Sequence, residues 1–381
     1  MDPSVIAELK EGVRRYVHDR LVPLEETVAE TDSIPEEVRR EVAELGLFGM
    51  SIPEEYGGLG LTMAAESELV MELGWTSPAF RSLIGTNVGI GSQGILIDGT
   101  EAQKKAYLPR LASGELIASF CLTEPESGSD AASLRTRAVR DGDSYVLNGT
   151  KRFITNSPTA GIFTVMARTD PEASKAGGIS AFIVDSGLPG IQIAKPYRKM
   201  GQKGAQVADV IFDDVRVPAD CIIGGREGQG FKTAMKVLDR GRIHISALCV
   251  GVGRRLIDES LRYATERRQF GQPIVDFQLV QAMLADSQTD LLAAEALVRS
   301  VAARYDAGES LTMEAAATKY FCSEMVGRIA DRAVQVHGGS GYIADYPVER
   351  FYRDVRIFRL YEGTSQVLQL VIAREMKRRA G

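Results

Sequence analysis

The sequence has few residues of the kinds that bind metal ions or form disulfide bonds. It contains three histidines and four cysteines in 381 residues, and no two of these seven residues stand within four positions of one another. Cys121, Cys221, Cys249 and Cys322 are far apart and form no CxxC pair. We therefore expect no metal site, and the cysteines are typical of reduced thiols in a reducing compartment.

The chain also lacks an excess of positive charge and any long apolar run. Its formal net charge is −6 and its isoelectric point about 5.4, which argues against binding to nucleic acid or to an anionic membrane. No apolar stretch approaches the length that spans a membrane. The first residues show neither the apolar core of a signal peptide nor the Arg/Ser bias of a transit peptide. We therefore expect a cytoplasmic protein without membrane insertion.

Proline and the hydrophobic pattern divide the chain into three segments. Residues 1–118 carry apolar residues at helical spacing, and Ser33 resembles an N-cap for a helix that starts near Glu36. Residues 119–225 hold six of the fourteen prolines and short β-branched runs separated by turn signals, which predicts an all-β domain. Residues 226–381 hold only two prolines, and long amphipathic patterns at 229–268 and 275–307 suit a helical bundle. The predicted fold is mainly α with an inserted all-β domain.

A GxGxxG sequence at residues 89–94 is the pattern of a dinucleotide-binding turn. That turn requires a buried strand before it and a helix after it within a parallel βαβ unit. This one lies inside the helical first segment of a chain with 38 glycines, so we interpret it as a chance match.

Two other stretches combine residues that suit a binding site. FCLTEPESGSD at 120–130 offers hydroxyls beside Gly128, whose backbone can approach a bound anion or the polar edge of a heteroaromatic ring; an ordinary polar turn is the alternative. Near the C-terminus, Gly338, Gly339 and Gly341 interrupt a helical pattern at about 1 kcal/mol each. Glu362 breaks the next helical run in an aromatic neighbourhood, although most glutamates are solvated surface charges.

Several motifs in one order carry a family resemblance over essentially the whole chain. They are CLTEPESGSD (121–130), KRFITN (151–156), KMGQKGAQVADVIFDDVRVP (199–218), LDRGR (238–242), ERRQFGQPIVDFQ (266–278) and QVHGGSGYIAD (335–345), followed by Arg350 and Asp354. In these motifs the chain resembles the acyl-CoA dehydrogenases, flavoproteins of fatty-acid and amino-acid oxidation.

The resemblance implies a fold, a cofactor and partners. The fold is an α-helical N-terminal domain, a β-barrel-like middle domain and a C-terminal four-helix bundle, with FAD between them. A cofactor shared across subunits implies a homotetramer, a dimer of dimers. The substrate is an acyl-CoA, and electron-transfer flavoprotein is the expected electron acceptor.

The resemblance also implies which residues hold FAD. Thr123 and Thr155 would hydrogen-bond the flavin ring, with Phe153 and Ile154 against its face and Ser129 at the pyrophosphate or the thioester side. Arg267, Phe270 and Gln278 would reach FAD in the neighbouring subunit, residues 335–339 would contact the adenosine end, and Thr364 and Gln366 would close the site. The full set is Leu122, Thr123, Gly128, Ser129, Phe153, Ile154, Thr155, Arg267, Phe270, Gln278, Gln335, Val336, His337, Gly338, Gly339, Thr364, Ser365 and Gln366.

In the family reaction an α-proton and a β-hydride leave the acyl-CoA together, giving a trans-2-enoyl-CoA. Glu362 stands at the position of the base, and the N–H of Gly363 would stabilise the enolate oxygen. Some members carry the base on the helix of the DRGR motif, where this chain has Gly241. Arg242 would organise the active-site helix, an ion pair with Asp239 being the compatible structural explanation. The substrate-binding residues implied are Arg81, Ser82, Ser129, Asp239, Arg242, Tyr361 and Gly363.

Arg81 bears on the choice of substrate. Phe80-Arg81-Ser82 resembles the Tyr-Arg-Ser of glutaryl-CoA dehydrogenase, whose arginine receives the distal carboxylate of the substrate. A buried arginine without an anionic partner is costly; alternatively Arg81 faces solvent or pairs with a glutamate such as Glu68. Residues 85–87 differ from the glutaryl enzyme, which we interpret as room for a longer diacid such as adipyl-CoA.

Other functions remain open on the sequence. They are a short-, medium- or branched-chain monocarboxylyl-CoA dehydrogenase, an acyl-CoA oxidase that uses O₂, and a catalytically silent family member. The presence of Glu362 argues against the last of these.

Overall fold

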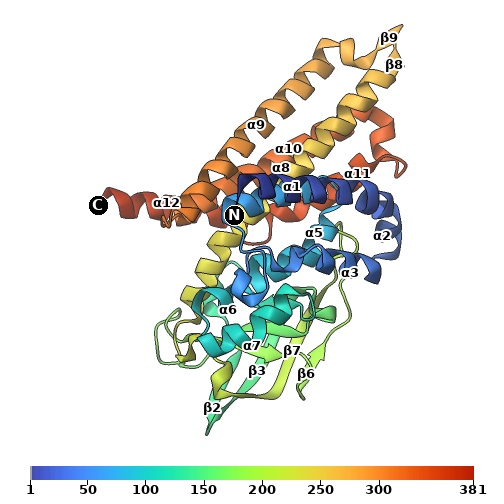
Figure 1. Cartoon of the computed structure of the whole chain (residues 1–381). Coiled ribbons are helices and arrows are strands. Elements are labelled where there is room, and N and C mark those ends of the chain that lie inside the picture. Colours follow the sequence, from blue (N-terminus) through green and yellow to red (C-terminus); the bar gives the residue numbers. More distant parts are fainter. Residues whose placement is uncertain (1) are drawn as a thin grey trace.

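The first of three successive groups of elements is helical. The computed structural model describes residues 2–381 (Figure 1). The α-helices of this group are α1 (Pro3–Tyr16), α2 (Glu25–Thr31), α3 (Glu36–Glu44), α4 (Met63–Leu73), α5 (Pro78–Gly85), α6 (Gln93–Asp98) and α7 (Glu101–Ala112), and η5 (Thr86–Gly91) is a π-helical turn between α5 and α6. At the start of α1, the Asp2 carboxylate accepts from the Ser4 N–H at 2.8 Å, and Pro3 occupies the first turn, as expected at a helix N-terminus.

The second group forms a strongly bent seven-stranded sheet. Its strands are β1 (Ala118–Cys121), β2 (Arg137–Asp141), β3 (Ser144–Thr155), β4 (Ile162–Arg168), β5 (Ile179–Asp185), β6 (Ile191–Ile193) and β7 (Val207–Pro218), in the order β1-β4-β2-β3-β7-β6 with β5 paired to β4. The β1–β4 pair is parallel, whereas β2–β3, β3–β7, β4–β5 and β6–β7 are antiparallel. Gly142, at φ +60°, lies in the turn between β2 and β3, where a positive φ favours glycine.

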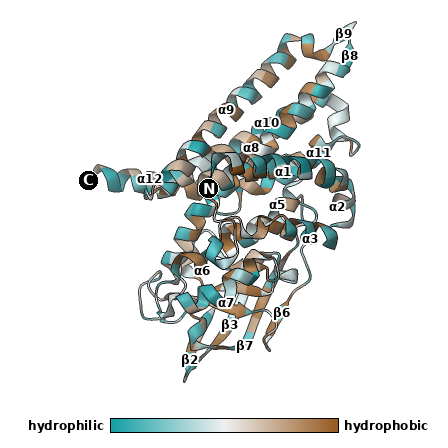
Figure 2. Ribbon diagram, viewed as in Figure 1, coloured by the Kyte–Doolittle hydropathy of each residue, from teal (hydrophilic) through white to brown (hydrophobic). Residues whose placement is uncertain are grey.

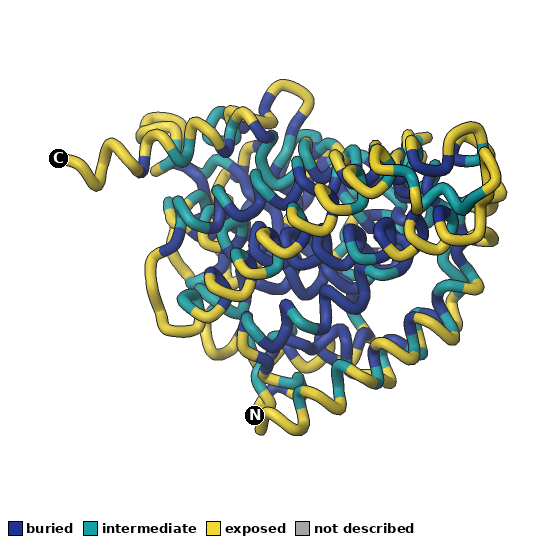
Figure 3. The backbone as a smooth tube through the Cα atoms, turned by 90° about the horizontal axis from the view of Figure 1, so that it is seen from above, coloured by how far each residue is buried: buried dark blue, intermediate teal, exposed yellow. Residues whose placement is uncertain are grey.

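The third group is again helical. It contains α8 (Gly230–Glu266), α9 (Gln278–Asp306), α10 (Thr312–His337), α11 (Pro347–Val355) and α12 (Ser365–Ala380), with the short hairpin of β8 (Arg268–Gln269) and β9 (Gln272–Pro273) between α8 and α9. The hairpin end of the bundle projects from the body of the molecule (Figure 1), and the last turns of α12 are exposed (Figure 3).

The two helical groups share one hydrophobic core. Its buried residues include Leu69 on α4, Phe80 on α5, Leu248 on α8 and Met325 on α10. A second cluster joins α7, β5 and the first turns of α8, so that α8 contacts every part of the fold. The apolar residues gather on the strands and between the helices, and the end of α12 is hydrophilic (Figure 2).

The predicted fold class is confirmed: a helical N-terminal part, a middle sheet and a helical C-terminal part. The two long patterns predicted at 229–268 and 275–307 are α8 and α9, with ends that differ by no more than three residues. Within residues 2–381, no helix has both the length and the apolarity needed to cross a membrane.

One local prediction is wrong, because Ser33 does not cap α3. The residue before the helix is Pro35, and no side chain accepts a hydrogen bond from the first turn. Glu36 and Glu37, acidic residues in the first turn, are instead favourably placed at the positive end of the helix dipole.

The GxGxxG sequence lies outside any βαβ unit, as predicted. It runs through η5 into α6 and follows α5, not a strand. A side chain at Gly91 would collide with the backbone of Ala118 in β1, so this glycine permits close packing of helix against sheet.

Candidate active site

Glu362 lies in a short break between two helices. The chain leaves the turn that ends at Arg359 and enters α12 at Ser365, where the Thr364 hydroxyl caps the helix by accepting from Val367 N at 3.2 Å. Glu362 has φ +52° and Gly363 has φ +100°. A left-handed backbone at a residue other than glycine is uncommon and occurs often at functional sites. The sequence correctly placed a backbone break here.

The Glu362 carboxylate lies over Gly241 of α8. A Cβ atom at Gly241 would be 2.6 Å from Glu362 Oε2 and 3.1 Å from Ile90 Cγ2. The Oε2 atom is buried and has no hydrogen-bond partner among the described residues. Gly241 therefore provides the space that the carboxylate occupies, and one oxygen remains available for another group.

Two cations hold the backbone around Glu362. The Lys319 ammonium on α10 donates to Gly363 O at 2.7 Å, and Arg242 Nε donates to Glu362 O at 3.3 Å. Burial lowers the pKa of Lys319 to about 8, against the attraction of the Glu362 carboxylate. Burial also raises the pKa of Glu362 above its usual range, although Arg81, Lys319 and Arg242 act in the opposite direction. The site thus contains a carboxyl group whose ionisation is shifted toward neutral pH.

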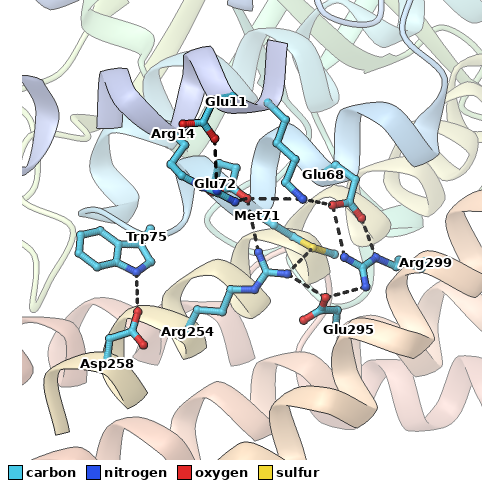
Figure 4. A network of polar contacts seen from close by, with 11 residues as sticks. Glu11, Arg14, Glu68, Met71, Glu72, Trp75, Arg254, Asp258, Glu295 and Arg299 are labelled. Atoms are coloured by element: carbon cyan, nitrogen blue, oxygen red, sulfur yellow. Dashed lines mark hydrogen bonds and ion pairs between the residues drawn. The ribbon is translucent and has the colours of Figure 1, made fainter. Parts of the chain in front are cut away.

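Arg81 is buried, with 4% of its surface exposed. Its Nε lies 3.1 Å from His244 Nδ1 on α8, and its Nη2 contacts the same nitrogen. No carboxylate among residues 2–381 forms an ion pair with it. Glu68 is instead held by Lys10 and Arg299, each at 2.6 Å, in a surface network (Figure 4). Both alternatives for Arg81, solvent exposure and pairing with Glu68, are therefore wrong.

His244 connects Arg81 to a buried ion pair. Its Nε2 lies 3.2 Å from Glu66 Oε1, and Glu66 Oε2 contacts the Arg240 guanidinium. All four side chains are buried. Burial, and then the charges of Arg81 and Arg240, keep the pKa of His244 well below its usual value, so the imidazole is neutral. His244 and Gly241 are one turn apart on α8, so this network and Glu362 lie on neighbouring parts of the contact between η5 and α8.

The interpretation of residues 85–87 as room for a longer acyl chain is wrong. A Cβ atom at Gly85 would lie 2.5 Å from Cζ of Arg81, so the space beside Gly85 is filled by the guanidinium. The Asn87 side chain is buried and bonded elsewhere, donating to Leu111 O at 3.1 Å and accepting from Ala118 N at 2.9 Å. Gly85 and Asn87 therefore leave no free space beside Arg81 for a longer acyl chain.

Several residues named for FAD lie together at the end of β3. The Arg152 N–H donates to Thr123 O at 2.8 Å, which ties the loop that carries Thr123 to the last residues of β3. The hydroxyls of both threonines have no partner among the described residues, and Phe153 is 58% exposed at φ +58°. An exposed aromatic ring beside two free hydroxyls suits a polar heteroaromatic ligand, and Gly128 and Ser129 are exposed on the adjoining loop. The side chains of Ile154 and Leu122 are in the core, so these two residues offer only their backbone, which corrects the expected contact of Ile154 with a ring face.

A second group of the residues predicted for FAD lies toward the projecting end of the bundle, away from β3 (Figure 1). Arg267, Phe270 and Gln278 are exposed at the projecting end of the bundle, and Phe270 is 94% exposed (Figure 1). Gln335 is exposed nearby, and Gly338 and Gly339 have open space where a Cβ atom would stand.

Four of the side chains predicted to bind FAD pack or form hydrogen bonds within the chain. Val336 is buried, and His337 stacks on Tyr263 with Nδ1 at 2.8 Å from Ala333 O. Ser365 is buried against Glu324, and the Thr364 hydroxyl caps α12; Gln366 is exposed. These four residues thus have partners inside the chain, and their contact with FAD stays a prediction.

Three of the predicted substrate-binding side chains also have contacts within the chain. Ser82 Oγ lies 3.1 Å from Pro78 O and 3.2 Å from Gln202 Oε1. Asp239 accepts from Arg242 and from the Thr312 hydroxyl, each at 2.7 Å, so the ion pair considered for Arg242 is present. Tyr361 stacks on Phe358, and its hydroxyl is buried without a partner.

Sequence reasoning missed His244, Glu66 and Lys319. The available signal for His244 was its position three residues after Gly241, on the same side of a predicted helix. Glu66 and Lys319 carried no comparable signal, because nothing in their local sequence distinguishes them from surface charges.

Comparison with known proteins defines the family. Residues 6–115, 119–215 and 228–377 match the N-terminal, middle and C-terminal domain models of acyl-CoA dehydrogenases. The chain is 42% identical to the acryloyl-CoA reductase (NADH) of Anaerotignum propionicum, over 100% of this chain and 97% of that protein.

Two solved structures have nearly the same fold. A chain from a study of the electron transferring flavoprotein of Acidaminococcus fermentans and flavin-based electron bifurcation has a TM-score of 0.95, 37% identity and coverage of 99% of both chains. The glutaryl-coenzyme A dehydrogenase in complex with glutaryl-CoA has a TM-score of 0.94 and 34% identity, covering 99% of this chain and 95% of that one.

The chain belongs to the acyl-CoA dehydrogenase family. It is an oxidoreductase that acts on a CH–CH bond of an acyl-CoA, and its cofactor is FAD. The free hydroxyls of Thr123 and Thr155 and the exposed Phe153 ring fit this cofactor.

The Gly85–Arg81 contact makes a prediction about stability. Gly85→Ala is expected to lower the apparent melting temperature, because the new Cβ would force the buried guanidinium from its position; overpacking of this kind costs about 1–3 kcal/mol. The matched control is Gly89→Ala, whose Cβ would stand 3.6 Å from Arg81 Nη2, an ordinary contact. Thermal unfolding of the FAD-loaded variants checks this, and equal melting temperatures would refute the close contact.

Proposed function

We propose that the enzyme dehydrogenates a dicarboxylyl-CoA, such as glutaryl- or adipyl-CoA, to the trans-2-enoyl-CoA. In this proposal Glu362 is the base and Arg81 binds the distal carboxylate of the acyl group. The observation that carries it is the burial of Arg81 with no carboxylate partner in the chain.

The charges around Arg81 support this substrate class. Arg240 and Glu66 form an ion pair, and His244 is neutral. Arg81 attracts the Glu362 carboxylate but forms no ion pair with it, so no carboxylate of the described residues is bonded to Arg81. Removing one partner from a buried ion pair costs about 3–5 kcal/mol, which indicates how unfavourable an uncompensated buried charge is. A substrate carboxylate would compensate it, and a guanidinium can bind a carboxylate with two parallel hydrogen bonds. A hydrocarbon chain end would leave the charge uncompensated.

Glu362 has the properties of a base for the α-proton. Its Oε2 is buried and unpartnered, and its raised pKa brings it closer to the working pH, where a general base is most effective. The backbone N–H of Gly363 donates to no atom of the described residues, so it is free to stabilise the thioester oxygen as negative charge develops. Bound FAD supplies the acceptor for the β-hydride. Lys319 and Arg242 keep the Glu362–Gly363 backbone in place during the proton transfer.

The assembly and the electron acceptor are part of the proposal. Four large apolar side chains of the C-terminal part are each more than 70% exposed: Phe270 in the β8–β9 hairpin, Leu279, Tyr342 and Leu370. Together with the exposed Arg267 and Gln278, they support a homotetramer in which the bundle end of one subunit completes the FAD site of another. The likeness to the chain from the electron transferring flavoprotein study supports electron-transfer flavoprotein as the acceptor. We place the enzyme in the cytoplasm.

Glu362→Gln tests the base. The variant is expected to keep FAD and its melting temperature while the rate of flavin reduction falls by about 10²–10⁴-fold. In the wild type the rate should rise with pH, because the base must be ionised, and its midpoint should lie above 4.5, the ordinary value for a glutamate carboxyl. Stopped-flow reduction between pH 5 and 9 measures both. A fully active variant would remove Glu362 from the mechanism.

Gly241→Ala tests the position of the carboxylate. The new Cβ would stand 2.6 Å from Glu362 Oε2, the end of a flexible side chain, so the carboxylate should move while the fold persists. We expect a melting temperature close to that of the wild type and a slower flavin reduction. An unchanged rate would show that Glu362 does not act from the position over Gly241.

Arg81→Met tests the substrate class. With purified FAD-loaded enzyme, the ratio of kcat/KM for glutaryl- or adipyl-CoA to that for hexanoyl-CoA should favour the diacids in the wild type. In the variant this ratio should fall by about 10²–10³-fold, because one partner of a buried ion pair is lost. If hexanoyl-CoA is the better substrate of the wild type, the enzyme is a monocarboxylyl-CoA dehydrogenase. If no acyl-CoA reduces the flavin, the chain is a silent family member.

A further inference from the structure

We infer that His244 is a specificity-determining residue that acts through Arg81: it holds the guanidinium in place, and Glu66 fixes the tautomer that allows it to do so. The inference rests on the proposed function, because it concerns the residue that would bind the distal carboxylate. His244 itself is a positioning residue and makes no contact with the substrate.

The donors and acceptors determine the tautomer of His244. A guanidinium has only donors, so the ring nitrogen that meets Nε and Nη2 of Arg81 must be an acceptor. That nitrogen is Nδ1, and the proton of the neutral ring therefore resides on Nε2. Nε2 lies 3.2 Å from Glu66 Oε1, and this close contact does not have the geometry of a hydrogen bond. The proton on Nε2 thus faces a carboxylate oxygen, and the lone pair on Nδ1 faces the Arg81 guanidinium.

Glu66 is itself held from the other side. The Arg240 guanidinium contacts Glu66 Oε2 and also lies 3.4 Å from Val88 O. Because all of these side chains are buried, water cannot substitute for a missing partner. The direction of the imidazole is consequently set by buried charges and not by solvent.

This arrangement leaves one end of Arg81 free. Nε and Nη2 are directed to His244, whereas Nη1 has no hydrogen-bond partner among residues 2–381 and is not one of the fully enclosed unpartnered atoms. Gly85 also lies against the guanidinium, next to Nε and Cζ, so the group is packed between His244 and the α5 backbone. A guanidinium held at one edge presents the rest of its donors in a fixed direction, which lowers the entropy lost when a carboxylate binds.

Substitution of His244 by two amides separates its two contacts. Asparagine places a carbonyl oxygen near the position of Nδ1, and His244→Asn can still accept from Arg81. Glutamine places its amide near the position of Nε2, and His244→Gln can still donate to Glu66 but offers Arg81 no acceptor. His18→Asn, at an exposed histidine stacked on Trp75, is the control for loss of a histidine.

The readout is the ratio of kcat/KM for glutaryl- or adipyl-CoA to that for hexanoyl-CoA, with FAD content measured in each variant. We expect His244→Asn and His18→Asn to retain the preference of the wild type for diacids. His244→Gln should lose about tenfold to a hundredfold of it, the effect of a hydrogen bond to a charged group, mainly through KM for the diacid. Combined with Arg81→Met, His244→Gln should add nothing further, because the two residues act as a unit.

Each outcome has a defined meaning. If the wild type prefers diacids and His244→Gln keeps that preference, or its effect adds to that of Arg81→Met, the inference about His244 is wrong and the proposed function stands. If the wild type shows no preference for diacids, the proposed function fails and the inference fails with it. Should neither amide variant fold, nitrogen-15 NMR of the histidine-labelled holoenzyme tests the same contact: a proton on Nε2 alone supports it, and a proton on Nδ1 of His244 overturns it.

Discussion

Burial of Arg81 against His244 takes a positive charge out of water without giving it a carboxylate from the chain. Much of the surrounding structure accommodates this one charge. Gly85 leaves the space that the guanidinium fills, and His244 stays neutral because burial, and then the charges of Arg81 and Arg240, lower its pKa. Glu66 already forms an ion pair with Arg240, so it cannot neutralise Arg81 as well. Arg81 therefore has no ion-pair partner until an anion enters the site.

The helix α8 links the position of Arg81 to the position of the Glu362 carboxylate. It carries Gly241, over which the Glu362 carboxylate lies, and one turn later His244, which holds Arg81. A single rigid element thus fixes the spacing between a base and an anion-binding group. Because α8 also packs against the sheet at its start and against the other bundle helices along its length, that spacing is tied to the whole fold. Lys319 and Arg242 supply the remaining constraint by holding the left-handed backbone of Glu362 and Gly363.

The order of helical, β and helical segments could be predicted from the sequence, because proline and hydrophobic periodicity are local signals. The break at Glu362 could also be predicted, since a glycine and two aromatic residues interrupt a helical pattern there. Residues 85–87 could not be interpreted correctly, because the atom that fills the space beside Gly85 belongs to the side chain of Arg81. The partner of Arg81 depends on which carboxylates already form other ion pairs. Glu68 pairs with Lys10 and Arg299, and both of these residues are far from it in the sequence. The choice of partner among buried charges is a property of the tertiary structure, and the sequence alone left it open.

The most direct test of this account is a crystal structure of the Glu362→Gln variant with FAD and glutaryl- or adipyl-CoA bound. The account predicts a distal carboxylate oxygen at hydrogen-bond distance, about 2.7–3.2 Å, from a guanidinium nitrogen of Arg81, with His244 still in contact with the same group. A distal carboxylate directed away from Arg81, toward solvent or another cation, would contradict it and leave Arg81 as a structural residue only.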